Sequence, residues 1–141
     1  MALEFYTYNS TKRVLIPYFD TKVNAGFPSP AQDYSELTID LNEHLLPHPS
    51  STFIIRVNGD SLKDEGIDNN SILVVDRSEP YKKGAIAIVN IDNEFTIKKI
   101  EKREGKYYLV GANKTFQPIL INEDIELFIW GIVTWVLNPK Y

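Results

Sequence analysis

One serine and one lysine of this chain have the residue type and the surroundings that catalysis needs. Ser61 lies in the hexapeptide Val57-Asn58-Gly59-Asp60-Ser61-Leu62, where a strand-like segment runs into a glycine and then presents the hydroxyl on a turn. Gly59 permits a sharp turn there, and successive backbone N–H groups can converge on an oxyanion that develops during acyl transfer. Because glycine, aspartate and serine also form ordinary turns, this hexapeptide alone does not establish a nucleophile.

A serine nucleophile needs a general base, and the composition restricts the choice. The chain has no cysteine and two histidines, His44 and His48, both in a proline-bounded stretch before the β-rich region. A Ser-His-Asp arrangement would require one of them to fold back toward Ser61. Lys98 is the other candidate, because strict strand alternation places it between a threonine and an isoleucine, where an ammonium can be desolvated. The local pattern alone does not choose Lys98 over Lys99.

The string Gly-Asp-Ser-Leu at residues 59–62 also matches the motif for which a group of lipases and esterases is named. Those enzymes place the serine between a first strand and a helix, and they carry Asp-x-x-His near the C-terminus. Here no histidine follows Ser61, and Gly66, Asn69 and Asn70 leave no room for a long helix. The likeness to those enzymes is therefore superficial.

The composition indicates one folded domain and excludes several classes of site. The chain has 141 residues, of which 43% are hydrophobic, so it can bury a core. With 15 basic and 19 acidic residues its formal charge is −4, which argues against sequence-specific binding to DNA. The absence of cysteine excludes disulfides and thiolate metal sites, and we expect neither a cofactor nor a metal. No signal-peptide core or membrane-length apolar run is visible, so we expect a soluble cytoplasmic protein without a membrane anchor.

The pattern along the chain predicts an all-β fold, mostly antiparallel, with an extended N-terminal arm and one short helix. Residues 1–36 show no sustained period and contain several prolines, so we interpret them as the arm, and residues 37–141 as a compact β domain. Asp40 followed by Glu43 predicts the start of a brief helix that ends near Leu46, before Pro47. Strand signals separated by Gly, Asn and Asp turns then follow at residues 53–57, 72–75, 85–89, 95–100, 107–110, 119–121 and 127–137.

Four segments together resemble the UmuD branch of the LexA-like family of self-cleaving serine peptidases. They are Gly26-Phe27-Pro28-Ser29-Pro30-Ala31, the hexapeptide at residues 57–62, Val74-Val75-Asp76-Arg77 and Glu94-Phe95-Thr96-Ile97-Lys98-Lys99. The resemblance runs from about residue 25 to the C-terminus, and the motifs occur in the family's order and spacing.

The resemblance implies a site, a fold and a set of partners. Ser61 matches the family nucleophile and Lys98 its general base, and the backbone N–H groups of Asp60 and Ser61 match the oxyanion hole. The scissile bond would join Ala25 to Gly26. The family fold is an all-β peptidase domain that forms a homodimer. Cleavage is stimulated by the RecA filament on single-stranded DNA, and the trimmed dimer joins a UmuC-type subunit of an error-prone translesion polymerase.

Two positions depart from the family pattern. UmuD itself commonly has Cys-Gly at the cut, where this chain has Ala25-Gly26, the pair more typical of LexA repressors. Leu62 stands where the family usually has methionine, a change of similar volume that a core tolerates. Neither departure removes a catalytic group, although the alanine can change the cleavage rate.

Other functions are compatible with part of the sequence pattern. A non-catalytic module whose arm binds a partner is the main alternative. A LexA-type repressor would need a helix-turn-helix domain, and the residues before Gly26 are too few for three packed helices. A signal peptidase shares the Ser-Lys chemistry but carries a membrane anchor or an apolar docking surface, and no such anchor is visible. The sequence leaves open whether cutting occurs within one chain or between partners of the dimer.

Overall fold

The computed structural model describes residues 2–6, 15–17, 38–59, 62–112, 115–126 and 128–140. The chain forms two units: Met1–Tyr8 together with Ser50–Tyr141, and Asn9–Pro49. Asp60 and Ser61, like Ala25 and Gly26, lie outside the described residues. The division into an arm at residues 1–36 and a domain at 37–141 stays a prediction.

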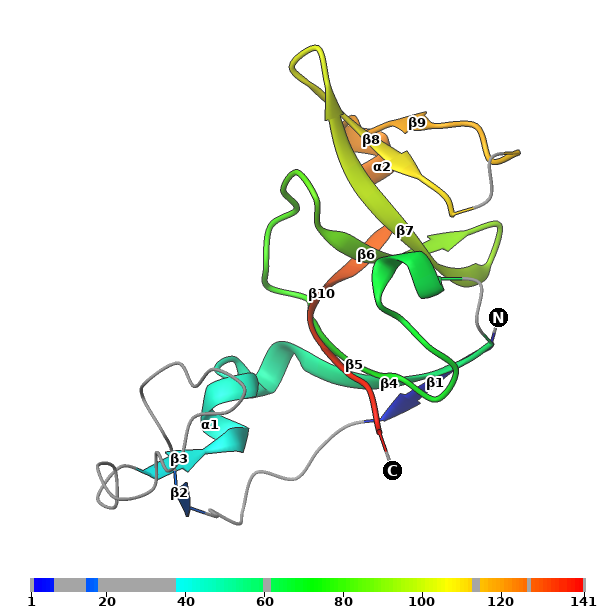
Figure 1. Ribbon diagram of the computed structural model, residues 1–141. Helices are drawn as coiled ribbons and strands as arrows, with labels where there is room; N and C mark the ends of the chain where they lie inside the picture. Colours follow the sequence, from blue (N-terminus) through cyan, green and yellow to red (C-terminus); the bar gives the residue numbers. More distant parts are fainter. Residues whose placement is uncertain are drawn as a thin grey trace, which may run out of the picture. The chain divides into compact units, whose positions relative to one another are not determined.

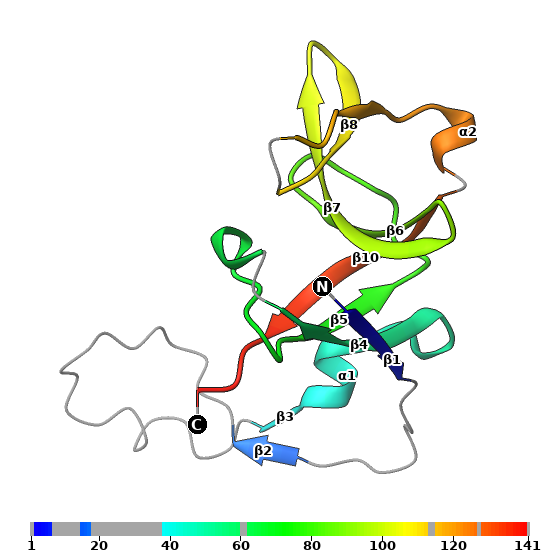
Figure 2. The same cartoon turned by 90° about the vertical axis from the view of Figure 1, so that its right-hand side faces the viewer.

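The larger unit is a sheet of eight strands, shown in Figures 1 and 2. Its strands, in spatial order, are β1 (Ala2–Tyr6), β4 (Thr52–Asn58), β5 (Ile72–Asp76), β10 (Ile129–Leu137), β6 (Ile86–Ile91), β7 (Glu94–Arg103), β8 (Lys106–Val110) and β9 (Ile119–Leu120). Every neighbouring pair is antiparallel. The prediction of a mostly antiparallel β fold is therefore confirmed.

The last strand lies in the middle of this sheet. β10 pairs with both β5 and β6, and its register shifts in each ladder. At one of these shifts Gly131 is buried, and a Cβ atom built there would lie 2.6 Å from Val75 Cγ1. The strand can approach β5 this closely because glycine has no side chain. Any larger residue in place of Gly131 would therefore push β10 away from β5.

Two apolar clusters fill the larger unit. The first cluster contains Ile55, Val57, Leu62, Ile67, Leu73, Val75, Ile88 and Ile97. The second cluster contains Ala87, Val89, Ile100, Leu109, Ile121 and Ile132. Strands β6 and β7 supply residues to both clusters, so both of their faces are buried, as Figure 1 shows for the curved path of β7 between β6 and β8. Ile97 and Ile100 of β7 are therefore shielded from water, whereas Lys98 and Lys99 between them stay partly exposed.

The smaller unit contains a two-stranded sheet and a helix. β2 (Leu15–Pro17) pairs antiparallel with β3 (Thr38–Asp40), and α1 (Leu41–Leu45) follows directly. The Asp40 side chain accepts a hydrogen bond from the Asn42 N–H at 3.1 Å, so the predicted cap is confirmed. The helix ends before Pro47, as predicted.

Some elements differ from the sequence prediction. Residues 1–36 show no sustained period in the sequence, yet two segments of this range form the strands β1 and β2. The described residues contain a second α-helix, α2 (Glu123–Glu126), where one short helix was expected. Two 3₁₀ turns, η2 (Pro49–Ser51) and η3 (Lys63–Glu65), were also not predicted. These elements are short, and most of the missed strands depend on partners far away in the sequence.

Candidate active site

Lys98 lies in the middle of β7, opposite Ala87 of β6. Its side chain is half-buried, and burial lowers the pKa of its amine below the ordinary lysine value. Its Nζ lies 4.2 Å from the centre of the Phe116 ring, which contributes to the apolar surroundings. Among the residues that the structure describes, no carboxylate lies within ion-pair distance of this amine. Desolvation without a compensating anion favours the neutral amine, which is the form that can accept a proton.

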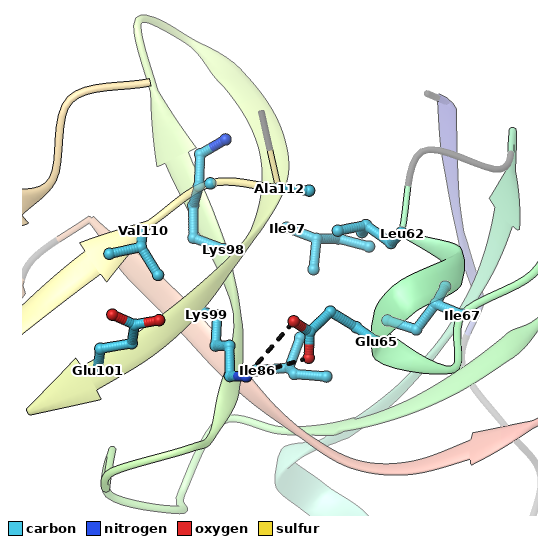
Figure 3. A pocket seen from close by; sticks show the side chains of 11 residues that line it. Leu62, Glu65, Ile67, Ile86, Ile97, Lys98, Lys99, Glu101, Val110 and Ala112 are labelled. Carbon is cyan, nitrogen blue, oxygen red and sulfur yellow. Dashed lines mark hydrogen bonds and ion pairs between the residues drawn. The ribbon is translucent and has the colours of Figure 1, made fainter. Parts of the chain in front are cut away.

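Lys99 is next in the strand and has different surroundings. Its Nζ lies 3.4 Å from both carboxylate oxygens of Glu65, a residue of η3. Figure 3 shows the two lysines pointing toward opposite ends of the same pocket, with the ion pair at one end. The Lys99 amine is thus engaged by a carboxylate, whereas the Lys98 amine lies over an aromatic ring. The surroundings therefore separate two lysines that the sequence pattern could not separate.

The pocket between η3 and β7 has a volume of about 70 Å³. Its walls include Lys98 and Lys99 from β7 and Leu62 and Glu65 from the turn that follows position 61. Leu62 is buried and belongs to the same apolar cluster as Ile97, the residue before Lys98. The residues that adjoin positions 61 and 98 in the chain are thus packed together in one core.

The described residues on either side of positions 60 and 61 are anchored by hydrogen bonds. Before them, Gly59 adopts φ +117°, a conformation that favours glycine, and its N–H donates to Asn69 Oδ1 at 2.8 Å. After them, the Leu62 carbonyl accepts hydrogen bonds from the Glu65 and Ile67 N–H groups at 3.0 and 3.2 Å. The predicted sharp backbone at Gly59 is confirmed. Nothing in the sequence indicates that Asn69 holds Gly59, because asparagine at this position is equally typical of an ordinary turn.

The loop after this turn is tied to the end of β10. The Ser71 hydroxyl is buried, accepts from the Asp68 N–H and donates to the Asn138 side chain. The Asn138 amide in turn donates to the Gly66 carbonyl at 2.9 Å. These bonds hold the loop at residues 66–71 and, through it, the buried Leu62. The roles of Asn138 and Phe116 could not be predicted from the sequence, because each contacts residues that are distant in the chain.

The remaining predicted site residues stay predictions. Ser61 and Asp60, with their backbone N–H groups, and the Ala25–Gly26 bond lie outside the described residues. His44 belongs to α1 and His48 follows it, both in the smaller unit.

The chain is similar to known proteins over most of its length. The model of a family described as Peptidase S24-like matches residues 17–134. The chain belongs to this family. It is 39% identical to the protein MucA of Salmonella typhimurium over 136 residues, which cover 95% of this chain and 92% of MucA. It is 38% identical to the protein ImpA of the same organism, over 86% of this chain and 83% of ImpA.

The likeness extends to a repressor. The LexA repressor of Shewanella woodyi is 33% identical over 118 residues, which cover 83% of this chain and 57% of the repressor. The S24-like family and its LexA member confirm the resemblance to the LexA-like self-cleaving serine peptidases and, through MucA and ImpA, to their UmuD-like branch. None of the helices in the described part of the chain is long and apolar enough to cross a membrane.

Proposed function

We propose that this chain is a self-cleaving serine peptidase of the SOS response to DNA damage, and that it cuts its own Ala25–Gly26 bond with Ser61 and Lys98. The observation that carries the assignment is the state of Lys98: burial lowers its pKa, and no described carboxylate opposes that effect. Leu62, the residue after Ser61, lines the same pocket as Lys98, which supports a short path between the two catalytic side chains. Membership of the S24-like family supports the reaction class.

The reaction requires one proton acceptor and one oxyanion site. The neutral Lys98 amine takes the proton of the Ser61 hydroxyl, and Oγ attacks the carbonyl carbon of Ala25. The backbone N–H groups of Asp60 and Ser61 stabilise the tetrahedral oxyanion. The C–N bond then breaks, and the Lys98 ammonium returns its proton to the amine of Gly26. Water finally hydrolyses the ester between Ser61 and Ala25, which frees the enzyme.

Docking of the cleavage segment assists the lysine. Lys98 is half-buried, so water still reaches part of its side chain in the described structure. A peptide segment seated over it would exclude that water and lower the pKa of the amine further. A small alanine and a glycine at the bond allow such a close approach without a clash. Docking would thus bring the scissile bond to the site and favour the neutral Lys98 amine in the same step.

The partners follow from the same assignment. We propose that the protein forms a homodimer, that the RecA filament on single-stranded DNA stimulates its cleavage, and that it acts in the cytoplasm where that filament forms. The trimmed dimer would serve as an accessory subunit of an error-prone translesion polymerase with a UmuC-type catalytic partner. The relationship to MucA, ImpA and LexA supports a role in this response.

The test is the pH dependence of cutting by the purified full-length chain. Between about pH 7 and the pKa of Lys98, the cleavage rate should rise roughly tenfold for each pH unit, because the neutral fraction of the amine does. Intact-mass spectrometry should show one product that begins at Gly26, with the same rate in the presence of a metal chelator.

Three variants complete the experiment. Ser61→Ala and Lys98→Ala should each abolish cutting, whereas Lys99→Ala, which removes the neighbouring ion-paired amine, should cut at nearly the wild-type rate. A second set of reactions with RecA, ATP and single-stranded DNA should be faster at neutral pH. A chain that never shortens at alkaline pH, or that shortens equally well without Lys98, would refute the assignment.

A further inference from the structure

The first strand of the chain closes one edge of the large sheet. β1 pairs antiparallel with β4, from Ala2 opposite Asn58 to Tyr6 opposite Ile54, and the two strands lie side by side in both Figure 1 and Figure 2. β1 is the outermost strand on this side, so without it β4 would present its free N–H and C=O groups to solvent. An unpaired edge of this kind readily accepts another extended chain.

The side chain of Phe5 anchors this strand. Its ring meets Phe95 of β7 at a centroid distance of 5.1 Å and Trp130 of β10 at 5.2 Å, both in edge-to-face geometry. Trp130 also contacts Phe53 of β4 at 5.0 Å and lies beneath the Arg77 guanidinium at 4.7 Å. Removal of Phe5 would therefore leave a notch lined by aromatic rings beside the free edge of β4.

The other side chains of β1 define what this edge recognises. Leu3, two residues before Phe5, packs against the first apolar cluster, so the inward positions alternate as a strand requires. Between them, exposed Glu4 stands directly opposite exposed Arg56 of β4. Opposite charges at facing positions of a strand pair attract each other. The edge thus selects an extended segment with the pattern apolar, acidic, aromatic.

We propose that self-cleavage converts the β4 edge into an acceptor site for an extended strand of a partner protein, with an aromatic side chain that takes the place of Phe5 and an acidic one opposite Arg56. This inference rests on the proposed cut after Ala25, which separates β1 from the sheet that binds it. While attached, β1 occupies the edge at an effective concentration on the order of millimolar. Once severed, it is diluted into the cell and competes poorly with other strands.

The exposure of β1 indicates that it is held weakly enough to exchange. Phe5 is 39% exposed and Tyr6 46% exposed, although both belong to a paired strand. The Tyr6 hydroxyl donates to Glu4 of its own strand at 2.6 Å, so this bond does not fasten β1 to the body. Among the described residues, the anchorage of β1 consists of one backbone ladder, the Phe5 ring, the packing of Leu3 and the exposed pair of Glu4 and Arg56. Such a strand is retained by its covalent link and is displaceable when that link is cut.

The experiment releases β1 without using the chain's own activity. A full-length Ser61→Ala chain receives a recognition site for a sequence-specific protease within residues 9–14, is purified folded, and is then cut at that site. Binding of a fluorescent peptide of residues 1–8 to the cut protein is measured by polarisation, with the uncut protein as control. We expect a dissociation constant in the micromolar to low millimolar range after the cut and no binding before it.

Two altered peptides test the recognition pattern. The peptide with Phe5→Ala should bind about tenfold or more weakly, because it loses both ring contacts. The peptide with Glu4→Lys should bind about two- to fivefold more weakly at low salt, because it places a cation opposite Arg56.

The remaining outcomes would overturn the proposal. In the first, the severed fragment that contains β1 stays bound through dilution and is not displaced by the peptide. In the second, the cut protein binds no peptide at millimolar concentration. In the third, the cut protein pairs with a second copy of itself instead. Because Ser61 is replaced throughout, each of these results is independent of whether the chain cleaves itself. If the wild-type chain fails to self-cleave while the cut Ser61→Ala protein binds the peptide, the proposed function is refuted. The β4 edge would still be an acceptor for an extended strand.

Discussion

Replacement of Phe116 by leucine should make cleavage faster at neutral pH. The ring lies 4.2 Å from Lys98 Nζ, so it acts on the amine in two opposite ways. Its apolar mass excludes water and favours the neutral amine, whereas its π-face attracts the ammonium and favours the charged one. Leucine keeps most of the apolar mass and removes the π-face. The neutral, proton-accepting form of Lys98 should therefore become more populated.

The size of the effect follows from the strength of the contact. Because Lys98 is half-buried, the cation–π contact belongs to the weaker, partly exposed class, at about 0.5–1 kcal/mol. Removal of that much stabilisation from the charged form raises the neutral fraction, and with it the rate below the pKa, about 2- to 5-fold. Above the pKa nearly all of the amine is neutral in both proteins, so the plateau rate should not change.

The assay is the rate of appearance of the product that begins at Gly26, measured across pH for wild type, Phe116→Leu and Phe116→Ala. The leucine profile should move to lower pH. The alanine profile should move to higher pH, because water then reaches the amine and desolvation is the cause of its lowered pKa. A leucine variant that is slower at neutral pH, or an alanine variant whose profile moves downward, would refute this account of the niche around Lys98.

Two further predictions concern the same site. Lys98→Met should raise the melting temperature at pH 7, because burial disfavours the ammonium of Lys98 in the folded state. The wild type gains stability as the pH rises toward the ordinary lysine pKa, because its folded form releases the proton more readily than its unfolded form. The difference in melting temperature between the two proteins should therefore shrink at alkaline pH. Lys99→Met, which breaks the Glu65 ion pair, should not reproduce this gain. Asn69→Ala should slow cutting about fivefold through loss of the bond to the Gly59 N–H, with an unchanged pH profile, and Asn69→Asp, which keeps an acceptor oxygen, should restore most of the rate.

Local chemistry in the sequence was enough to predict several elements of the fold. The Asp40 cap, the strand that ends before Gly59 and the strand that carries Lys98 all depend on residues close together in the chain. The half-apolar setting of Lys98 was also predictable, since it follows from the alternation of its own strand. The alternation had a limit, because Ile97 and Ile100 lie on opposite faces of β7 and are both buried. Strand β7 therefore has no single polar face, and alternation alone does not tell which of its side chains are exposed.

The features that the sequence did not predict depend on contacts between distant residues. β1 has five residues, and its pairing partner begins at Thr52, so nothing in its own neighbourhood indicates a strand. The central position of β10 comes from the order of strands in the sheet. The approach of Phe116 to Lys98 and the bond from Gly59 to Asn69 arise in the same way. Strand propensity is local, whereas strand pairing and side-chain contact are set by the tertiary fold.

The half-burial of Lys98 offers a physical reason for regulated cleavage. A fully buried amine would be neutral and ready at all times, and the chain would cut itself as soon as it folded. A fully exposed amine would stay protonated, and no docked segment could activate it without a large change in its solvation. On the proposed assignment, partial burial would leave enough water to keep the basal reaction slow, and any event that seats the cleavage segment over the amine would remove that water. A stimulating partner therefore needs to stabilise only the docked position of the segment, and on the proposed assignment this is the step on which the RecA filament would act.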